Sequence, residues 1–264
     1  MNIFGNNRSV GIPGPPGEDA FDLIRWLPDA VRRMFRETEL ITIYFDTAID
    51  GIIYDDKTPN GLKNRGKGPP CLLVKGKPFP KIHQIKSSGS WMAELRDTLF
   101  KLKPVRTGTI GPSVTIYVMS FRAIEMSMEP RVIFSNEKGT RAISVVERKK
   151  GKTDVEGCLT IYASGSQKDI IFDWDDWGTL LLQYTVFDGV VNCQYILNSE
   201  SGSLEPSKQD DWDDITIYIG GHPTKKGALH SLAWFEMYHV EEGETLPPKM
   251  CELLVLGARQ RVEP

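Results

Sequence analysis

Apolar and polar residues alternate with a period of two from Leu40 onward, in short runs rich in β-branched and aromatic residues. Turn-forming stretches such as NEKG (136–139), SGS (164–166) and DG (188–189) separate the runs. Many short strands with almost no helix between them predict an all-β fold, an antiparallel β-sandwich. The runs are ITIYFD (41–46), GIIYD (51–55), SVTIYVMSF (113–121), RVIFS (131–135), AISVVER (142–148), CLTIYA (158–163), DIIFDW (169–174), TLLLQYTVF (179–187), NCQYILN (192–198), DITIYIG (214–220) and HSLAWFEMYHV (230–240).

Two later regions depart from this alternation. Residues 56–112 are rich in Gly, Pro and Lys and contain only brief apolar runs, which predicts long loops with one or two edge strands. The segment LPPKMCELLVLG (246–257) predicts a helical piece that begins at proline. We expect Met250, Leu253 and Leu254 of this piece to cover the edge of the sandwich.

The N-terminal region differs from the rest of the chain. Residues 1–19 are rich in Gly, Pro and Asn and are expected to be extended. Within 20–37, the residues Val31, Met34 and Phe35 form a narrow apolar stripe at helical spacing, opposite Arg32, Arg33 and Arg36. We therefore predict an extended arm (1–19), a short helical neck (20–37) and a sandwich domain (38–264). A helix this short needs a surface to pack on, either its own domain or a neighbouring subunit.

Charge and hydropathy exclude several classes of partner. The formal net charge is −3, and 32 basic and 35 acidic residues are mixed along the chain. Because no basic face is indicated, nucleic acid is not expected as a partner. No apolar stretch reaches the length of a membrane span, and MNIFGNNRSV lacks the order of a signal peptide. We expect neither membrane insertion nor export by the general secretory route.

The four cysteines, Cys71, Cys158, Cys193 and Cys251, are far apart and form no CxxC pair. A zinc site is therefore not expected, and a disulfide framework is not required, although the spacing leaves open whether the cysteines are paired. Cys158 and Cys193 lie in apolar strand-like runs, which predicts that both are small buried residues.

The C-terminal half carries an ordered set of motifs. WGTLLLQYTV begins at Trp177, a DG turn follows, and the return strand ends in YILN (195–198). TIYIGG (216–221) precedes ALHSLAWFEMYHV and the closing LPPKM segment. This order resembles the laminin-G-like, concanavalin-A-like lectin jelly roll over residues 110–256, and 44–62 would supply its first strands. The resemblance implies a jelly-roll sandwich in which Trp177 packs inward, although the family's common Trp-His-His is here Trp177-Gly178-Thr179.

Enzyme motifs are incomplete. Glycoside hydrolases of this fold resemble one another in an E-x-D-x-x-E strand that pairs two carboxylates, and the chain has no such strand. Alginate-lyase relatives share three strand motifs; KIHQI (81–85) and ELR (94–96) echo two of them in the wrong order, and the third is missing. The chain also lacks a Gly-x-Ser-x-Gly elbow and a P-loop, and its four histidines show no metal-like spacing. We therefore predict no catalytic residues.

Acidic and aromatic residues together suggest a binding surface. Trp174 with Asp175, and Trp212 with Asp213, place an indole beside carboxylates, which suits stacking on a sugar ring and hydrogen bonding to its hydroxyls. These four residues are the predicted ligand-binding residues, and packing of the tryptophans in the core or at its rim is the alternative. No cofactor is expected; Ca²⁺ held by the acidic loops at 46–56, 173–176 and 210–214 is an option beside plain turn hydrogen bonding.

Residues 11–19 form three consecutive Gly-X-Y triplets, with glycine at 11, 14 and 17. Glycine at every third position is what a collagen triple helix requires. Three triplets are too few to hold three chains, so a homotrimer would depend on the heads or on the neck residues Val31, Met34 and Phe35. A stiff polyproline spacer is the alternative.

These features together predict a non-enzymatic attachment protein: a lectin-like head on the surface of a virion or particle, which faces the extracellular side without a signal peptide. Its partners would be a surface glycan or receptor, a second and third copy of itself, and other virion proteins through the N-terminal arm. One alternative is a capsid or assembly decoration that binds no glycan. Another is a polysaccharide-active enzyme.

Overall fold

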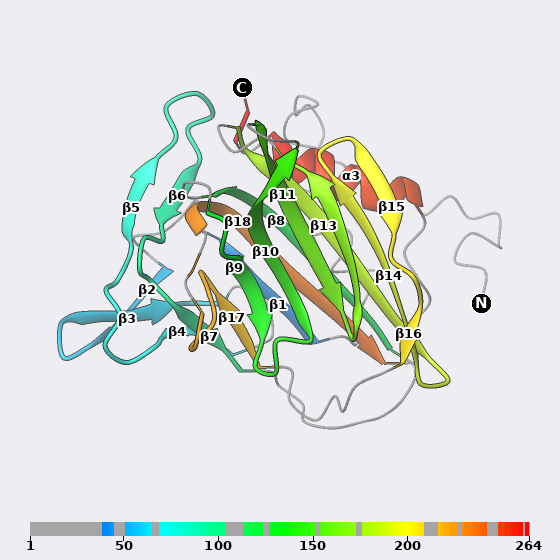
Figure 1. Ribbon diagram of the computed structural model, residues 1–264. Helices are drawn as coiled ribbons and strands as arrows, with labels where there is room; N and C mark the ends of the chain where they lie inside the picture. Colours follow the sequence, from blue (N-terminus) through cyan, green and yellow to red (C-terminus); the bar gives the residue numbers. More distant parts are fainter. Residues whose placement is uncertain are drawn as a thin grey trace, which may run out of the picture.

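The computed structural model of the protein describes residues 39–44, 51–64, 69–103, 113–123, 127–150, 154–172, 176–208, 216–225, 227, 229–241, 248–260 and 262–263. These residues form two antiparallel sheets of nine strands each and one C-terminal helix, α3 (Pro248–Arg259). Figure 1 shows how the sheets and the helix are arranged. The predicted antiparallel β-sandwich is confirmed. The arm and the neck, which contain Gly11, Gly14, Gly17, Val31, Met34 and Phe35, lie outside the described residues.

The first sheet, sheet A, has the strand order β15-β14-β13-β8-β18-β6-β5, with β1 paired to β18 and β16 paired to β14. Its strands are β1 (Glu39–Tyr44), β5 (Lys81–Gln84), β6 (Trp91–Glu94), β8 (Ser113–Ala123), β13 (Gly178–Phe187), β14 (Val190–Leu197), β15 (Glu200–Ser203), β16 (Ser207–Lys208) and β18 (Leu229–Glu241).

The second sheet, sheet B, has the order β12-β11-β10-β9-β17-β7-β4-β3-β2. Its strands are β2 (Ile52–Asp55), β3 (Thr58–Leu62), β4 (Cys71–Leu73), β7 (Phe100–Leu102), β9 (Arg131–Asn136), β10 (Arg141–Lys150), β11 (Asp154–Ala163), β12 (Ser166–Ile171) and β17 (Ile217–Ile219).

The region 56–112 is more regular than its composition indicates. It contributes five short strands, β3 to β7, where the sequence predicts long loops with one or two edge strands. These strands have three to five residues each, so a period of two has too few repeats to stand out in the sequence. Pairing with longer neighbours, such as β18 beside β6, stabilises them in the sheets.

The main core lies between the two sheets and follows the alternation of the strands. In β8, Tyr117, Met119 and Phe121 face this core, and in β13 it receives Leu180, Leu182 and Tyr184. Sheet B contributes residues such as Phe100, Phe134, Ile143, Leu159 and Ile161.

The helix α3 covers the outer face of sheet A. A second apolar cluster joins Cys251, Leu254, Val255 and Ala258 of the helix to Val114, Ile116, Val118, Leu181, Trp234 and Tyr238 of the sheet. Leu254 is buried as predicted, while Met250 and Leu253 are half-buried. The helix therefore packs across a sheet face, where the sequence predicts that it covers an edge. In Figure 1, α3 lies behind sheet A, on the side away from β9, β10 and β17.

Two further predictions agree with the structure. Cys158 and Cys193 are buried, as predicted; Cys71 and Cys251 are buried as well, and none of the four forms a disulfide. The DG turn at Asp188-Gly189 joins β13 to β14 with φ values of 48° and 71°, the left-handed pair that a two-residue hairpin requires. No described helix is long and apolar enough to cross a membrane.

Candidate functional site

A row of chemically varied side chains crosses sheet A on its outer face, beyond the C-terminal end of α3. The strand register places Arg122 of β8 opposite Ser231 of β18, Ser231 opposite Glu94 of β6, and Glu94 opposite Lys81 of β5. Gly178 of β13 pairs with Phe121, so Trp177, the residue before this strand, lies beside Arg122. We call Trp177, Arg122, Ser231, Glu94 and Lys81 the cross-strand row.

One end of the cross-strand row combines an indole with a guanidinium group. The Arg122 guanidinium carbon lies 6.0 Å from the ring centroid of Trp177, within cation–π range. Both side chains are half-buried. Part of each is therefore fixed against the protein while the remaining surface is accessible to a ligand.

The other end is organised by the carboxylate of Glu94. Its Oε2 lies 3.3 Å from His83 Nε2, and its Oε1 lies 3.3 Å from Arg96 Nε. The Glu94 side chain is 26% exposed, against 45% for His83 and 64% for Arg96. The carboxylate is thus held between two more exposed polar groups and remains open to solvent. Solvent-exposed ion pairs such as Glu94 with Arg96 add about 0–1 kcal/mol to the free energy of unfolding, so this cluster contributes little to the stability of the fold.

A small apolar cluster lies next to the cross-strand row on the outer face of sheet A and includes Trp177 of the row. Buried Ile85, Ala233 and Val262 pack together, with Met92 and Trp177 partly buried against them. Ile85 and Met92 share the outer face with Lys81, His83 and Glu94, because residues two apart on a strand point to the same side. The cluster packs Val262, which follows α3, against β18 and the β5–β6 hairpin.

The backbone of β18 is irregular at this position. Its register against β8 shifts twice, between Leu229 and Ser231 and between Leu232 and Trp234. Such bulges bend a strand and re-aim its side chains, and they are over-represented next to functional sites. The two shifts bracket Ser231, the middle residue of the cross-strand row. Ser231 is 1% exposed and forms the floor of the row.

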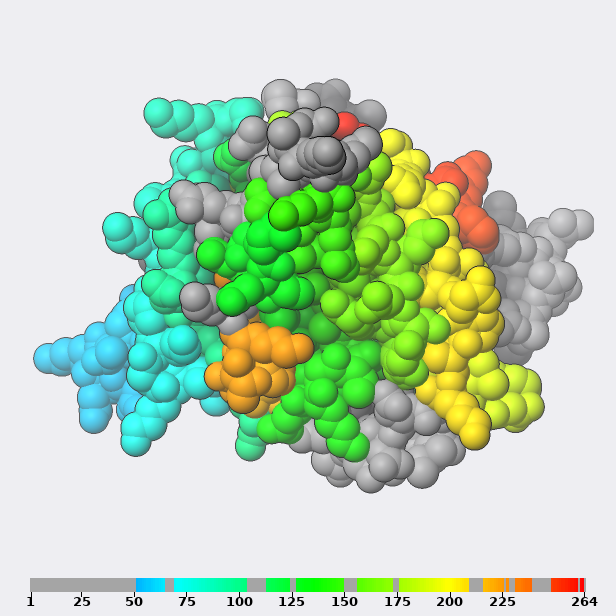
Figure 2. Space-filling view, in the orientation of Figure 1, coloured from blue at the N-terminus to red at the C-terminus, as the bar shows by residue number. Residues whose placement is uncertain are grey.

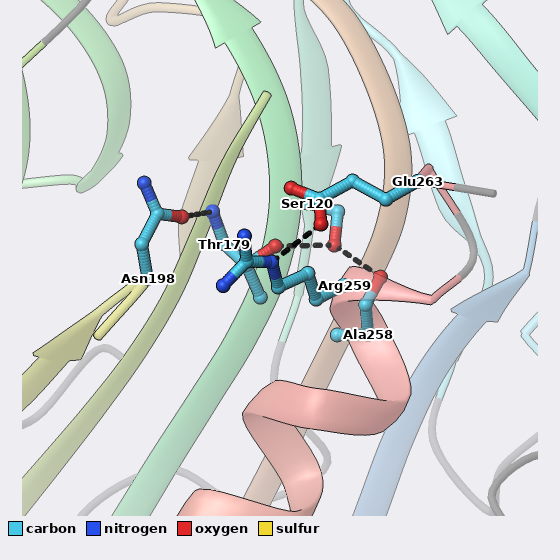
Figure 3. Close-up of polar contacts among 6 residues, drawn as sticks. All are labelled: Ser120, Thr179, Asn198, Ala258, Arg259 and Glu263. Atoms are coloured by element: carbon cyan, nitrogen blue, oxygen red, sulfur yellow. Dashed lines mark hydrogen bonds and ion pairs between the residues drawn. The ribbon is translucent and has the colours of Figure 1, made fainter. Parts of the chain in front are cut away.

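The C-terminal end of α3 lies beside Ser120 and Thr179 on the outer face of sheet A (Figure 3). Ser120 Oγ donates a hydrogen bond to the Ala258 carbonyl oxygen over 2.8 Å and lies 3.4 Å from Thr179 Oγ1. The Thr179 main-chain N–H donates to Asn198 Oδ1 over 2.8 Å, and Arg259 Nε donates to Glu263 Oε2 over 2.6 Å. Ser120 precedes Arg122 by two residues, and Thr179 follows Trp177 by two, so each lies on the same face of sheet A as its row residue. The helix end is therefore fixed directly next to Arg122 and Trp177.

The chemistry of the cross-strand row suits a polyhydroxylated ligand. A carboxylate can accept hydrogen bonds from sugar hydroxyls, guanidinium and ammonium groups can donate to them, and an indole can contact apolar C–H surface. A metal centre is not indicated here: among the described residues, no group of three or more His, Cys, Asp or Glu side chains gathers closely enough to hold an ion. The acidic segments 46–50, 173–175 and 209–215 lie outside the described residues.

The sequence did not single out this row. The predicted binding residues Trp174, Asp175, Trp212 and Asp213 lie outside the described residues, and their role stays a prediction. Trp177 differs from expectation: it is half-buried on the outer face of sheet A and does not belong to the core between the sheets. The available signal was the pair of fragments KIHQI and ELR, which occupy and flank the neighbouring antiparallel strands β5 and β6.

A second polar cluster lies on the outer face of sheet B, which faces the viewer in Figures 1 and 2. Asp169 Oδ1 accepts a hydrogen bond from Thr160 Oγ1 over 2.6 Å, and Asp169 Oδ2 lies 3.1 Å from Arg148 Nη2. Both carboxylate oxygens therefore already have protein partners. This cluster matches the Glu94 cluster in charge and exposure and provides a comparison for it.

Comparisons with known proteins bear on the fold. No protein-family model and no curated protein sequence matches the chain. Among solved structures, the chain is similar to domain 4 of AbnA, a GH43 extracellular arabinanase from Geobacillus stearothermophilus, in complex with arabinotriose. The TM-score is 0.51 at 15% identity, over 83% of this chain and 99% of that domain. At this identity the likeness shows the fold alone, a two-sheet β-sandwich.

Two weaker likenesses have TM-scores below 0.5. The binding domain of botulinum neurotoxin DC in complex with SialylT has a TM-score of 0.45 at 11% identity, over 85% of this chain and 51% of that chain. The GH131 β-glucanase catalytic domain from Podospora anserina has 0.42 at 12% identity, over 69% and 82%. Of these three structures, the arabinanase domain is the one that bears on the fold.

Proposed function

We propose that the protein is a non-catalytic carbohydrate-binding protein whose cross-strand row contacts the glycan. The observation that carries this proposal is the row itself: an indole and a guanidinium group on one side of the buried Ser231, and a carboxylate and an ammonium group on the other, lie on one sheet face. These are the side chains that recognise sugar hydroxyls and sugar C–H surface. The arabinanase domain of similar fold is in complex with arabinotriose, which supports a sugar as the ligand class. Fold alone does not choose a function.

The row does not have the layout of a glycosidase site. Retaining and inverting enzymes need two carboxyl groups, about 5–5.5 Å or about 6.5–9.5 Å apart. Within the row, Glu94 supplies one carboxylate, and His83 and Arg96 already contact it. Binding without turnover is the function that this arrangement supports best.

In this proposal the sandwich is the head of an attachment protein on a virion or particle surface. The Gly-X-Y triplets at 11–19 and the apolar stripe at Val31, Met34 and Phe35 support a trimer built by the N-terminal region. Single sugar contacts are weak, and three linked heads raise the avidity for a multivalent target by orders of magnitude, about 10²–10⁴.

The test is retention of the full chain on arabinan, polygalacturonate and hydroxyethyl cellulose in affinity electrophoresis. The wild type is compared with Glu94→Gln and Trp177→Ala, and with Asp169→Asn as the matched control on sheet B. We expect retention by at least one polymer, loss of retention in the two row variants, and no effect of the control. A reducing-sugar assay on the same polymers should show no turnover. Absence of retention on every polymer would favour a decoration protein that binds no glycan. Loss of retention in Asp169→Asn alone would indicate that the glycan binds on sheet B and not at the cross-strand row.

A further inference from the structure

We infer that the cross-strand row binds an extended oligosaccharide segment that runs across the strands of sheet A, and does not recognise a single terminal sugar. This inference rests on the proposed function and concerns the ligand class of the same site. It is based on the length of the row, on the direction in which the row crosses the strands, and on the end of α3 that lies beside the row.

The length of the row exceeds one sugar ring. Its five residues belong to five neighbouring segments, at β13, β8, β18, β6 and β5. Neighbouring strands are about 4.8 Å apart, so four intervals span ~19 Å from Trp177 to Lys81. A monosaccharide can reach one end of such a row, whereas a linear chain can pass over the buried Ser231 and contact the accessible members at both ends.

The direction of the ligand follows from what surrounds the row. Along the strands, Ser120 and Thr179 are the next buried polar positions inward from Arg122 and Trp177, and Ser120 bonds to the end of α3. The helix end therefore blocks a ligand that would lie parallel to β8 and β13. Across the strands, the accessible groups lie at the two ends of the row, because Ser231 in the middle is buried. Trp177 and Arg122 are half-buried at one end. At the other end Glu94 is partly exposed and Lys81 is exposed, with His83 and Arg96 beside them.

The two ends of the row have different chemistry, so they act as separate subsites. The Trp177 end offers indole surface and a guanidinium group, while the Lys81 end offers an ammonium group, the Glu94 carboxylate and an imidazole. Substitutions at sites far apart in a structure have additive effects on free energy. Trp177 and Lys81 are separated by more than the ~7–10 Å within which coupling is common.

The experiment is titration calorimetry of the full chain with arabino-, galacturono- and cello-oligosaccharides of one to six units, the same three chemistries as in the retention test. In the series that binds, we expect the affinity to rise by about tenfold or more between the monosaccharide and the tetrasaccharide and then to level off. Trp177→Ala and Lys81→Ala should each weaken binding of the hexasaccharide several-fold, and the double variant should show the product of the two factors.

The outcomes separate this inference from the proposed function. A monosaccharide that binds as tightly as its hexasaccharide would overturn the inference and leave glycan binding intact. If Trp177→Ala weakens binding of the hexasaccharide and Lys81→Ala leaves its affinity unchanged, recognition is restricted to one end of the row, and the inference is overturned as well. If no series binds and no polymer is retained, the proposed function fails as well. Unchanged circular dichroism and melting temperature of Lys81→Ala, an exposed side chain, exclude misfolding as the cause of an effect.

Discussion

The Ser120 hydroxyl donates a hydrogen bond to the Ala258 carbonyl over 2.8 Å, and this bond joins β8 to the last turn of α3 across 138 residues of sequence. A carbonyl in the last turn of a helix has no partner within the helix. Ser120 supplies that partner from the sheet below, so the helix end is fixed at the border of the cross-strand row (Figure 3).

Removal of this hydroxyl should loosen the helix end. Because Ser120→Ala leaves a carbonyl without its donor in a buried setting, we expect a loss of about 1–3 kcal/mol in the free energy of unfolding. Urea denaturation followed by circular dichroism measures this loss. Ser201→Ala, on exposed β15, is the matched control and should change stability by less than about 0.5 kcal/mol. Equal stability of both variants would mean that the bond contributes nothing.

The packing of α3 on sheet A depends on one large aromatic side chain. Trp234 is 1% exposed and belongs to the cluster under the helix. Trp234→Ala should destabilise the protein by about 3–5 kcal/mol, because the substitution leaves a cavity beneath α3. Phe187→Ala, at a side chain that is 60% exposed, should have little effect. Comparable denaturant midpoints for the two variants would contradict this account of the packing.

The binding prediction separates function from stability. Glu94→Gln removes a charge from a solvent-exposed cluster, so the free energy of unfolding should change by less than about 1 kcal/mol. Glycan retention should nevertheless fall, because an amide cannot accept hydrogen bonds as a carboxylate does. Asp169→Asn removes a carboxylate of similar exposure from sheet B. A similar loss of retention in both variants would indicate an effect of net charge and not of the row.

Alkaline pH should destabilise the protein through its buried thiols. Burial raises the pKa of Cys193 to about 12 and that of Cys251 to about 11, from a starting value of 9.0. Between pH 9 and these values the folded state binds more protons than the unfolded state, so stability is fully present below pH 9 and falls as pH rises. Urea midpoints measured from pH 8 to 11 should therefore decrease. In Cys193→Ala the decrease should be shallower; an unchanged slope would assign the effect to other groups.

The N-terminal region makes a separate prediction about assembly. Light scattering on the full chain and on a chain that begins at Thr38 should give a trimer and a monomer, respectively, if residues 1–37 hold the subunits together. Two monomers would make the Gly-X-Y stretch a spacer and would remove the avidity argument. Two trimers would place the contact in the heads.

The strand pattern was predictable in considerable detail because it depends on local alternation. The run at 179–187 corresponds to β13, the run at 113–121 to β8, and the run at 230–240 to β18. Alternation is clearest in β14, where exposed and buried residues alternate, whereas β8 and β13 are buried on both faces and are recognised by apolar runs of eight or more residues between turn signals. The three-residue strands β4 and β7 could not be found in this way, because their pairing partners and not their own sequences stabilise them.

By itself, the sequence determined an all-β sandwich with Cys158 and Cys193 buried and a proline-initiated C-terminal helix, since each of these follows from residues close together in the chain. The tertiary structure decided the candidate site. Trp177, Arg122, Ser231, Glu94 and Lys81 become neighbours only because β18 pairs with β8 on one side and with β6 on the other. That pairing depends on how both faces of sheet A are buried, by the core and by α3, and this is a property of the packed molecule that no local pattern of residues specifies.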